Sequence, residues 1–171
     1  MPFPSVQLQP GEIERFRETQ RFYSNHLLRI LVPIEFVVIT TIMGAVSMTV
    51  PAADQVKFWL IWFGAAVVLP GVIACMGMTT VVTDRRLLIR WFPPFPGRSV
   101  PLENISSAES VKYQPFTDTN GWGWKLSAKY HRVMSVAGDR GVHVRYGEGK
   151  NEQILIGTNR PDQLAESLRG Q

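Results

Sequence analysis

The chain has 171 residues and a formal net charge of +4, and 45 % of its residues are hydrophobic. Its mean hydropathy is close to zero, which indicates that part of the chain lies in lipid. The single cysteine, Cys75, excludes an intrachain disulfide and a metal site with several cysteine ligands.

Residues 1–27 precede the first long apolar segment. Apolar residues recur there at helical spacing with arginines among them, namely Ile13, Phe16, Tyr23 and Leu27 with Arg15, Arg17 and Arg21. This pattern predicts an amphipathic helix that lies on the membrane surface, although packing against the following domain fits the same residues. No signal peptide is expected, because a basic start followed by a short apolar run and a cleavage site is missing.

Two apolar segments within residues 28–78 predict a transmembrane helical hairpin. Residues 30–50 contain one charge, and residues 58–78 contain none. A helix of about 21 residues spans roughly 31 Å, which matches the core of a bilayer. The link between the segments, residues 51–57, allows only a tight turn, so the two helices are expected to run antiparallel. A buried helical hairpin of a soluble protein is the alternative.

Basic residues near the ends of the hairpin predict its orientation. Arginines flank it on both sides, at Arg15, Arg17, Arg21 and Arg29 before it and at Arg85, Arg86, Arg90 and Arg98 after it, whereas only Lys57 lies in the turn. The positive-inside rule therefore places both termini in the cytoplasm. The predicted location is the inner (plasma) membrane, with a multi-pass topology.

Glu35 is a possible intramembrane polar site. It lies about one and a half turns inside the first span, where an unpaired charge costs about 2.5–3.5 kcal/mol. The alternative is that Glu35 reaches headgroup water or pairs with Arg29 near the interface. One hairpin has neither the repeats nor the chain of intramembrane charges that transporters use, so we interpret it as an anchor.

After the second span the apolar residues recur at every second position rather than at helical spacing, which predicts strands. Half-buried strands are expected at residues 79–83, 87–91, 142–146 and 153–156. Asn120 and Gly121 predict a tight turn before a strand whose tryptophans, Trp122 and Trp124, are expected to face the core rather than a contact surface.

A closing helix is predicted from Pro161, with an apolar stripe formed by Leu164, Ala165 and Leu168. The predicted fold class is therefore α+β, in which the hairpin is followed in residues 79–171 by a cytoplasmic barrel or bent sandwich. Six or seven short strands and one C-terminal helix are expected in that domain.

Five short motifs in chain order resemble a known family. They are TDRRLLI (residues 83–89), VPLENI (100–105), GWG (121–123), RGV (140–142) and IGTNRP (156–161). Together with the preceding hairpin they are similar to bacterial pleckstrin-homology (PH)-like domains that carry a two-helix transmembrane anchor. The resemblance implies a PH-like bent β-barrel capped by the C-terminal helix. It implies no activity, because fold-level analogy does not specify function.

The distribution of charge favours a partner at the membrane. Residues 79–171 contain 13 Lys/Arg and 9 Asp/Glu, whereas the preceding residues balance at 5 and 5. An anionic leaflet attracts a tethered basic domain by about 1 kcal/mol for each well-placed basic residue. No nucleic-acid partner is expected, because no aromatic–basic platform or DNA-reading motif accompanies the charge.

The sequence shows no arrangement typical of a metal, cofactor or catalytic site. His26, His131 and His143 are dispersed without metal-ligand spacing, and His143 is expected to be solvated because it alternates with Val142 and Val144. No nucleophile motif or tuned carboxylate pair is present. An enzyme whose active site assembles from dispersed residues is the alternative.

The proline-rich segment between Arg90 and Arg98 is the predicted contact site. It places Trp91, Phe92 and Phe95 on a stiff loop between arginines. This combination suits contact with lipid headgroups or with a protein, and the resemblance implies a headgroup site in the same first hairpin. A loop packed on its own barrel is the alternative.

The leading hypothesis is a non-enzymatic membrane scaffold or assembly factor whose domain binds a protein partner in a membrane complex. The main alternative is a module that senses anionic membrane lipids through Arg85, Arg86, Arg90 and Arg98. Lipid binding through arginines should weaken steeply with salt, whereas an interface centred on aromatic residues should not.

Overall fold

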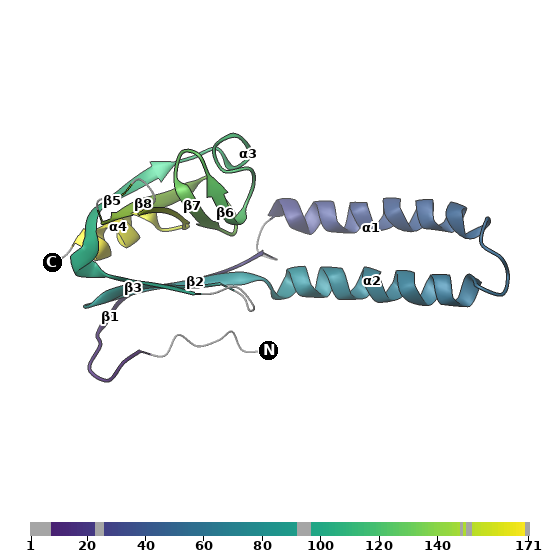
Figure 1. Ribbon diagram of the computed structural model, residues 1–171, viewed down its shortest axis with the longest axis horizontal. Coiled ribbons are helices and arrows are strands. Elements are labelled where there is room, and N and C mark those ends of the chain that lie inside the picture. The colour runs from purple at the N-terminus through teal and green to yellow at the C-terminus, as the bar shows by residue number, and fades with distance from the viewer. Residues whose placement is uncertain (1–7, 23–25, 92–96, 148, 150–151, 170–171) are drawn as a thin grey trace. The chain divides into compact units, whose positions relative to one another are not determined.

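The computed structural model describes residues 8–22, 26–91, 97–147, 149 and 152–169. The chain divides into two compact units (Figure 1). One is the helical hairpin, Phe22–Met76, and the other, which we call the β-domain, consists of Met1–Arg21 together with Gly77–Gln171. The hairpin is thus inserted into the β-domain, which begins before the hairpin rather than at residue 79 as predicted.

The hairpin consists of α1 (His26–Ser47) and α2 (Gln55–Cys75). Both helices are long and apolar enough to cross a membrane, and their apolar stretches, Arg29–Ser47 and Gln55–Val72, are not buried in protein. The second helix ends three residues before the predicted limit of residue 78, because the chain enters a strand at Gly77.

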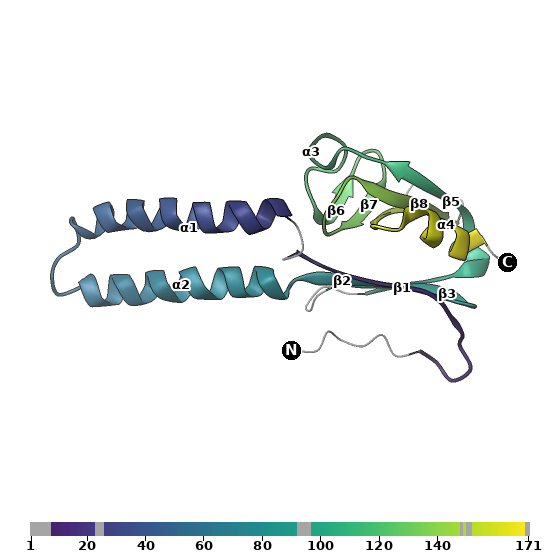
Figure 2. The ribbon, with the colours of Figure 1, turned by 180° about the vertical axis from the view of Figure 1, so that it is seen from behind.

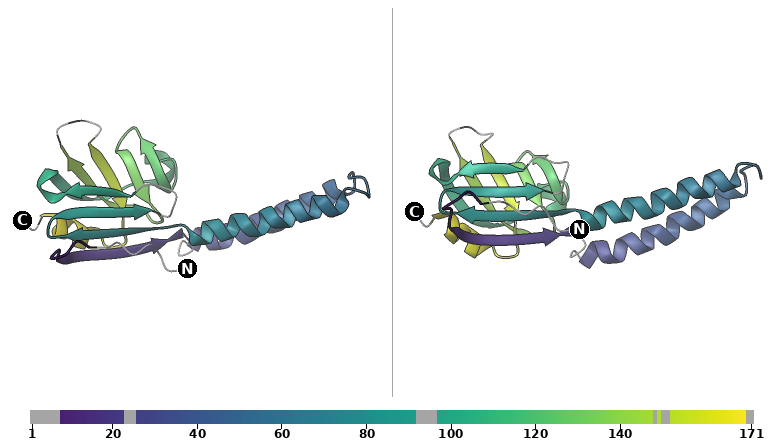
Figure 3. Two further views of the ribbon diagram at one scale, coloured as in Figure 1. Left: turned by 60° about the horizontal axis from the view of Figure 1, so that its bottom comes forward. Right: turned by 90° about the horizontal axis from the view of Figure 1, so that it is seen from below.

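The first sheet of the β-domain has four antiparallel strands in chain order: β1 (Glu14–Arg21), β2 (Gly77–Thr83), β3 (Arg86–Trp91) and β4 (Arg98–Pro101). Figure 3 shows them side by side. Arg21 is paired with Gly77, and Met78 is paired with Trp91. We call this end of the β-domain, where the chain leaves for the helices and returns, the hairpin end. The end that carries the β2–β3 turn is the far end.

The predicted interfacial helix in residues 1–27 is wrong for the described residues, because Glu14–Arg21 forms strand β1. Phe16, Glu18 and Gln20 are buried, whereas their neighbours are exposed. Two of these three buried residues are polar, so the apolar spacing did not reveal the strand period. Leu27, on which the helical pattern depended, belongs to α1.

Hydrogen bonds to the Glu18 carboxylate hold β1 against the segment that precedes the C-terminal helix. The carboxylate accepts hydrogen bonds from the Thr158 hydroxyl, from the Asn159 backbone N–H at 3.0 Å and from the Gln20 side-chain amide at 3.0 Å. That amide also donates to the Gly157 carbonyl at 3.0 Å. Burial of a charged carboxylate is tolerated here because several donors satisfy it.

The second sheet has five strands in the order β5-β8-β9-β7-β6, antiparallel except for the β7–β9 pair. The strands are β5 (Ile105–Lys112), β6 (Gly123–Ser127), β7 (His131–Ser135), β8 (Arg140–Tyr146) and β9 (Gln153–Gly157). The four strands predicted by alternation are confirmed as β2, β3, β8 and β9. Two short helices, η2 (Leu102–Asn104) and α3 (Pro115–Asp118), connect strands.

Helix α4 (Pro161–Arg169) closes the β-domain (Figure 2). It buries the predicted stripe of Leu164, Ala165 and Leu168 together with Pro161, and it packs against β5 and β8. The mixed α+β class is confirmed. Strand pairing in the described residues does not join the two sheets, so they do not form the closed barrel that the resemblance implies.

Two glycines from the sequence motifs lie where neighbouring chains approach closely. Gly141 and Gly157 are paired across β8 and β9. A Cβ on Gly157 would lie 2.6 Å from the Ser135 Cβ, and a Cβ on Gly141 would lie 2.6 Å from the Ile156 carbonyl oxygen. Only glycine fits this spacing without a shift of the backbone.

Candidate functional site

The register of β3 separates the four predicted contact arginines into two groups. Arg90 lies opposite Thr79 near the hairpin end, and Arg98 lies opposite Ile89 close to it. Arg86 lies opposite Pro101 at the far end, and Arg85 precedes it in the β2–β3 turn. Four strand residues span about 13 Å. Arg85 and Arg86 therefore lie toward the opposite end of β3 from Arg90 and Arg98.

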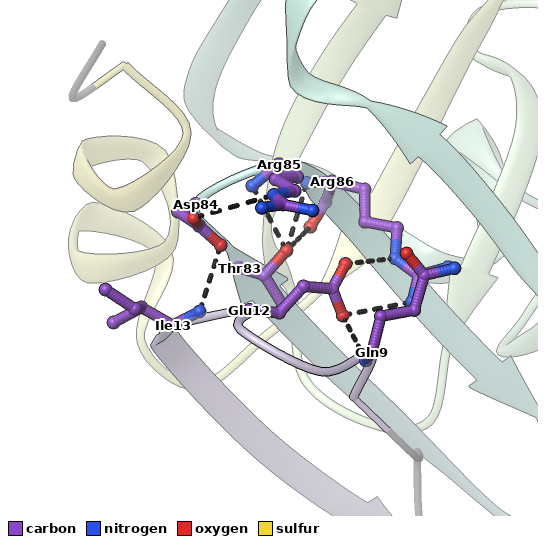
Figure 4. Close-up of polar contacts among 7 residues, drawn as sticks. All are labelled: Gln9, Glu12, Ile13, Thr83, Asp84, Arg85 and Arg86. Atoms are coloured by element: carbon purple, nitrogen blue, oxygen red, sulfur yellow. Dashed lines mark hydrogen bonds and ion pairs between the residues drawn. The ribbon is translucent and has the colours of Figure 1, made fainter.

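At the far end, Arg86 holds the chain that leads into β1 (Figure 4). Its guanidinium donates from Nε to Glu12 Oε1 at 2.6 Å and from Nη2 to Glu12 Oε2 at 3.0 Å. These hydrogen bonds lower the pKa of Glu12 and raise the pKa of Arg86. Arg86 is thus engaged within the β-domain rather than available to a membrane or a partner.

The rest of the β2–β3 turn supports the same arrangement (Figure 4). The Thr83 hydroxyl oxygen accepts from the backbone N–H groups of Arg85 at 3.2 Å and Arg86 at 3.1 Å. Asp84 Oδ1 accepts from the Ile13 backbone N–H at 3.0 Å. Arg85 itself is exposed and lies 3.9 Å from Asp84, which makes its ion pair weak.

Three of the predicted arginines, Arg86, Arg90 and Arg98, line one open groove of about 390 Å³ along β3 and β4. Arg90 is exposed, and the Arg98 guanidinium lies 5.1 Å from the centroid of the Tyr146 ring. Burial raises the pKa of Tyr146, which keeps its ring neutral beneath the cation. This groove is the part of the predicted site that could receive an acidic group.

The predicted aromatic contacts are only partly described. Trp91 is 3 % exposed and belongs to the core, so it is not a surface anchor as expected. It is the last residue of β3, and its pairing with Met78 turns the side chain to the buried face of the sheet. Phe92 and Phe95 lie outside the described residues.

Glu35 lies in the hairpin at a small pocket between α1 and α2. The pocket has a volume of about 140 Å³ and is lined by Val32, Glu35, Phe36, Ile39, Trp62, Ala65, Ala66 and Pro70. The Trp62 indole nitrogen is buried without a hydrogen-bond partner in the described residues. Glu35 thus remains a predicted intramembrane polar site, set in mostly apolar surroundings.

His143 is buried rather than solvated as the strand pattern predicted. It is 8 % exposed, its Nε2 lies 3.0 Å from Gln153 Oε1, and its ring meets Tyr130 edge-on. Both faces of β8 are covered over residues 141–144, so alternation along this strand does not separate solvent from core. In the part of the chain that the structure describes, no group of His, Cys, Asp or Glu could hold a metal ion.

The structure also exposes three large apolar residues, of which the sequence analysis had assigned Trp124 to the core. Phe116 in α3 and Trp124 and Leu126 in β6 are 66 %, 43 % and 65 % exposed. Trp124 and Leu126 share one face of β6, which is an edge strand of the second sheet. The sequence predicted that Trp122 and Trp124 face the core, but Trp124 is exposed, because alternation does not show whether a face is covered.

Comparisons of the chain with protein-family models, with curated proteins and with solved structures found no match.

Proposed function

We propose that the chain is a non-enzymatic membrane scaffold or assembly factor. In this proposal α1 and α2 cross the inner membrane, both termini are cytoplasmic, and the β-domain binds a protein partner at the membrane surface. The observation that carries the proposal is the insertion of two exposed apolar helices between the paired strands β1 and β2. A protein with this connectivity holds its folded domain at the membrane by two covalent links.

The links between the units are short. Residues 22–25 connect β1 to α1, and Met76 alone separates α2 from β2. An extended chain spans at most about 3.6 Å per residue, so the domain stays within a few residues of the membrane surface. A permanently held domain suits the assembly of a membrane complex better than it suits the capture of a distant soluble partner.

The charge of the β-domain supports a cytoplasmic location. Arg15, Arg17 and Arg21 lie in β1, immediately before the hairpin, and Arg90 and Arg98 lie near the hairpin end of the same sheet. The α1–α2 link contains Lys57, which is paired with Asp54 at 3.4 Å. This asymmetry follows the positive-inside rule.

We also propose that the β-domain is PH-like. Two sheets and a C-terminal helix packed against them support this assignment, as does the order of the sequence motifs along β3, β8 and β9. The proposal places β3, β4 and the segment between them at the headgroup site of the PH fold.

Binding of anionic lipid is the second candidate function. The register of β3 favours it for Arg90 and Arg98, which are near the hairpin end, but not for Arg85 and Arg86, which lie at the far end. Two arginines would contribute about 1 kcal/mol each, and salt would weaken that attraction.

A pull-down of the tagged full-length protein in mild detergent tests the proposed function. The test variant combines Phe92→Ala with Phe95→Ala and leaves Trp91 intact, because Trp91 is part of the core. Ile13→Ala is the matched control, since Ile13 is 68 % exposed next to β1 at the far end. We expect a stoichiometric protein partner that survives high salt and is lost only in the double variant. Retention of anionic lipid alone, released by salt, would contradict the scaffold and support lipid sensing.

A further inference from the structure

We propose that the pocket between α1 and α2 binds a cationic side chain, a lysine or an arginine, from a transmembrane helix of a partner protein. We call this space of about 140 Å³ the Glu35 pocket, and its lining is the set of residues given above. The proposal rests on the membrane anchor proposed above, and it adds a contact inside the bilayer to the contact made by the β-domain. It concerns the helical hairpin alone.

Glu35 lies on the face of α1 that is turned toward α2. The residues of α1 that line the pocket are spaced at i, i+3, i+4 and i+7, and those of α2 at i, i+3, i+4 and i+8. Residues at these spacings share one face of a helix. The Glu35 side chain therefore belongs to the seam between the two helices. It is also exposed, so a neighbouring helix can reach it.

The polar groups of the Glu35 pocket lack partners in the part of the chain that the structure describes. The Trp62 indole nitrogen is buried without an acceptor, and no hydrogen bond or ion pair engages Glu35. Pro70 has no N–H, so the Ala66 carbonyl one turn earlier lacks its usual helical donor. A carboxylate has several acceptor sites and can accept from the indole while it binds a cation. The pocket thus offers a carboxylate and a carbonyl to a group with several donors.

The depth of Glu35 favours a protein side chain over a lipid headgroup. Glu35 follows Arg29, the start of the apolar stretch of α1, by six residues, which is about 9 Å along the helix. The ammonium groups of lipids lie at the headgroup level instead. Arg29 does not compete, because only residues three or four apart are neighbours on a helix. Ionisable residues at such depth are costly and pair with one another.

The partner that supplies the cation is a different protein. Residues 30–56 and 58–78 contain no lysine or arginine. Lys57 lies at the start of α2 and is paired with Asp54 at 3.4 Å. A second copy of the chain would bring another carboxylate, not a cation, to the same level. Charge complementarity therefore identifies a membrane span with its own lysine or arginine, and pairing removes the cost of burying either charge alone.

The walls of the Glu35 pocket suit such a side chain. A lysine ammonium or an arginine guanidinium can donate charge-assisted hydrogen bonds to the Glu35 carboxylate. The aliphatic stem of either residue packs on apolar walls such as Phe36 and Ile39. Ala65 and Ala66 are small, and small residues allow a neighbouring helix to approach closely.

A synthetic transmembrane helix tests the proposal on the full-length chain. The probe is a peptide of leucine and alanine with one central lysine, and a second peptide carries methionine in its place. The protein is reconstituted in vesicles of phosphatidylethanolamine and phosphatidylglycerol, with a donor fluorophore on its exposed single cysteine, Cys75. Energy transfer to an acceptor on the peptide measures association. Glu35→Gln is the test variant, and Asp54→Asn is the matched control, because it removes one carboxylate outside the pocket.

We expect the lysine peptide to associate about tenfold more tightly than the methionine peptide, which corresponds to about one charge-assisted hydrogen bond. Asp54→Asn should keep this preference, and Glu35→Gln should abolish it. Equal association of the two peptides with the unmodified chain would overturn the proposal. A preference that survives Glu35→Gln, or that is lost equally in Asp54→Asn, would also overturn it.

Flotation of the protein with the vesicles after an alkaline wash separates this proposal from the anchor on which it rests. Equal association of the two peptides with flotation intact would contradict the Glu35 pocket alone and leave the scaffold proposal standing. Loss of flotation of the unmodified chain would contradict the anchor and with it the Glu35 pocket.

Discussion

Replacement of Trp91 with alanine is expected to lower the free energy of unfolding of the β-domain by about 3–5 kcal/mol. Trp91 is 3 % exposed at the end of β3 and is paired with Met78, which is also buried. Alanine would leave a cavity where the first sheet faces the core, and a packed core relaxes only partly around such a cavity. Chemical denaturation of the full-length protein in detergent, followed by far-ultraviolet circular dichroism, measures the loss.

Trp124→Ala is the matched control for this experiment, because Trp124 is 43 % exposed on an edge strand. The same change of residue type should cost much less there, since less apolar surface leaves the core. Equal losses in the two variants would contradict the assignment of Trp91 to the core. If Trp91→Ala keeps its stability but loses a bound partner, Trp91 would be a surface contact residue, as the sequence predicted.

Replacement of Glu18 with alanine is expected to detach β1 and to cost about 3 kcal/mol. Glu18 is buried, and its removal would leave the Thr158 hydroxyl, the Asn159 N–H and the Gln20 amide without their acceptor. A hydrogen bond to a charged group contributes about 1.5–3 kcal/mol, and bonds that share one acceptor are not additive. Hydrogen exchange with mass spectrometry should show β1 and residues 158–169 losing protection together.

Glu14→Ala is the control for Glu18→Ala. Glu14 lies in the same strand, but its ion pair with Arg17 is exposed to solvent. An exposed pair of this kind contributes at most about 1 kcal/mol. Unchanged protection of residues 158–169 in Glu18→Ala would show that β1 does not depend on this network.

The apolar patterns in the sequence were sufficient for much of the fold. Uninterrupted apolar length predicted α1 and α2, and alternation predicted β2, β3, β8 and β9. The stripe of Leu164, Ala165 and Leu168 predicted the buried face of α4. These predictions succeeded because one physical property, hydrophobicity, determines where such segments lie.

The sequence failed where polar groups are buried. Glu18 and Gln20 occupy core positions of β1, so a strand inserted before the hairpin had no apolar signature. The prediction that His143 is solvated was wrong for the same reason, because the hydrogen bond between its ring and Gln153 allows the side chain to be buried. Whether such a polar side chain is buried depends on hydrogen-bond partners from other strands or loops, and a local sequence pattern does not reveal these partners.

The arginines of the predicted contact site are spread along the sheet because residues close in sequence separate along a strand. Arg86 and Arg90 are four positions apart, yet one is bound to Glu12 at the far end and the other lies near the hairpin end. The exposure of Trp124 was missed because an edge strand leaves uncovered a face that the sequence alone assigns to the core. Register and sheet order, rather than composition, decide both cases.

The most direct test of the central claim is the topology of the hairpin in intact cells. In a Cys75→Ser background, Asp54→Cys places a thiol in the α1–α2 link, and Glu103→Cys places one in the β-domain. A membrane-impermeant maleimide added to spheroplasts should label residue 54 at once and residue 103 only after the membrane is permeabilised. Labelling of both residues from the same side of the intact membrane would contradict a spanning hairpin.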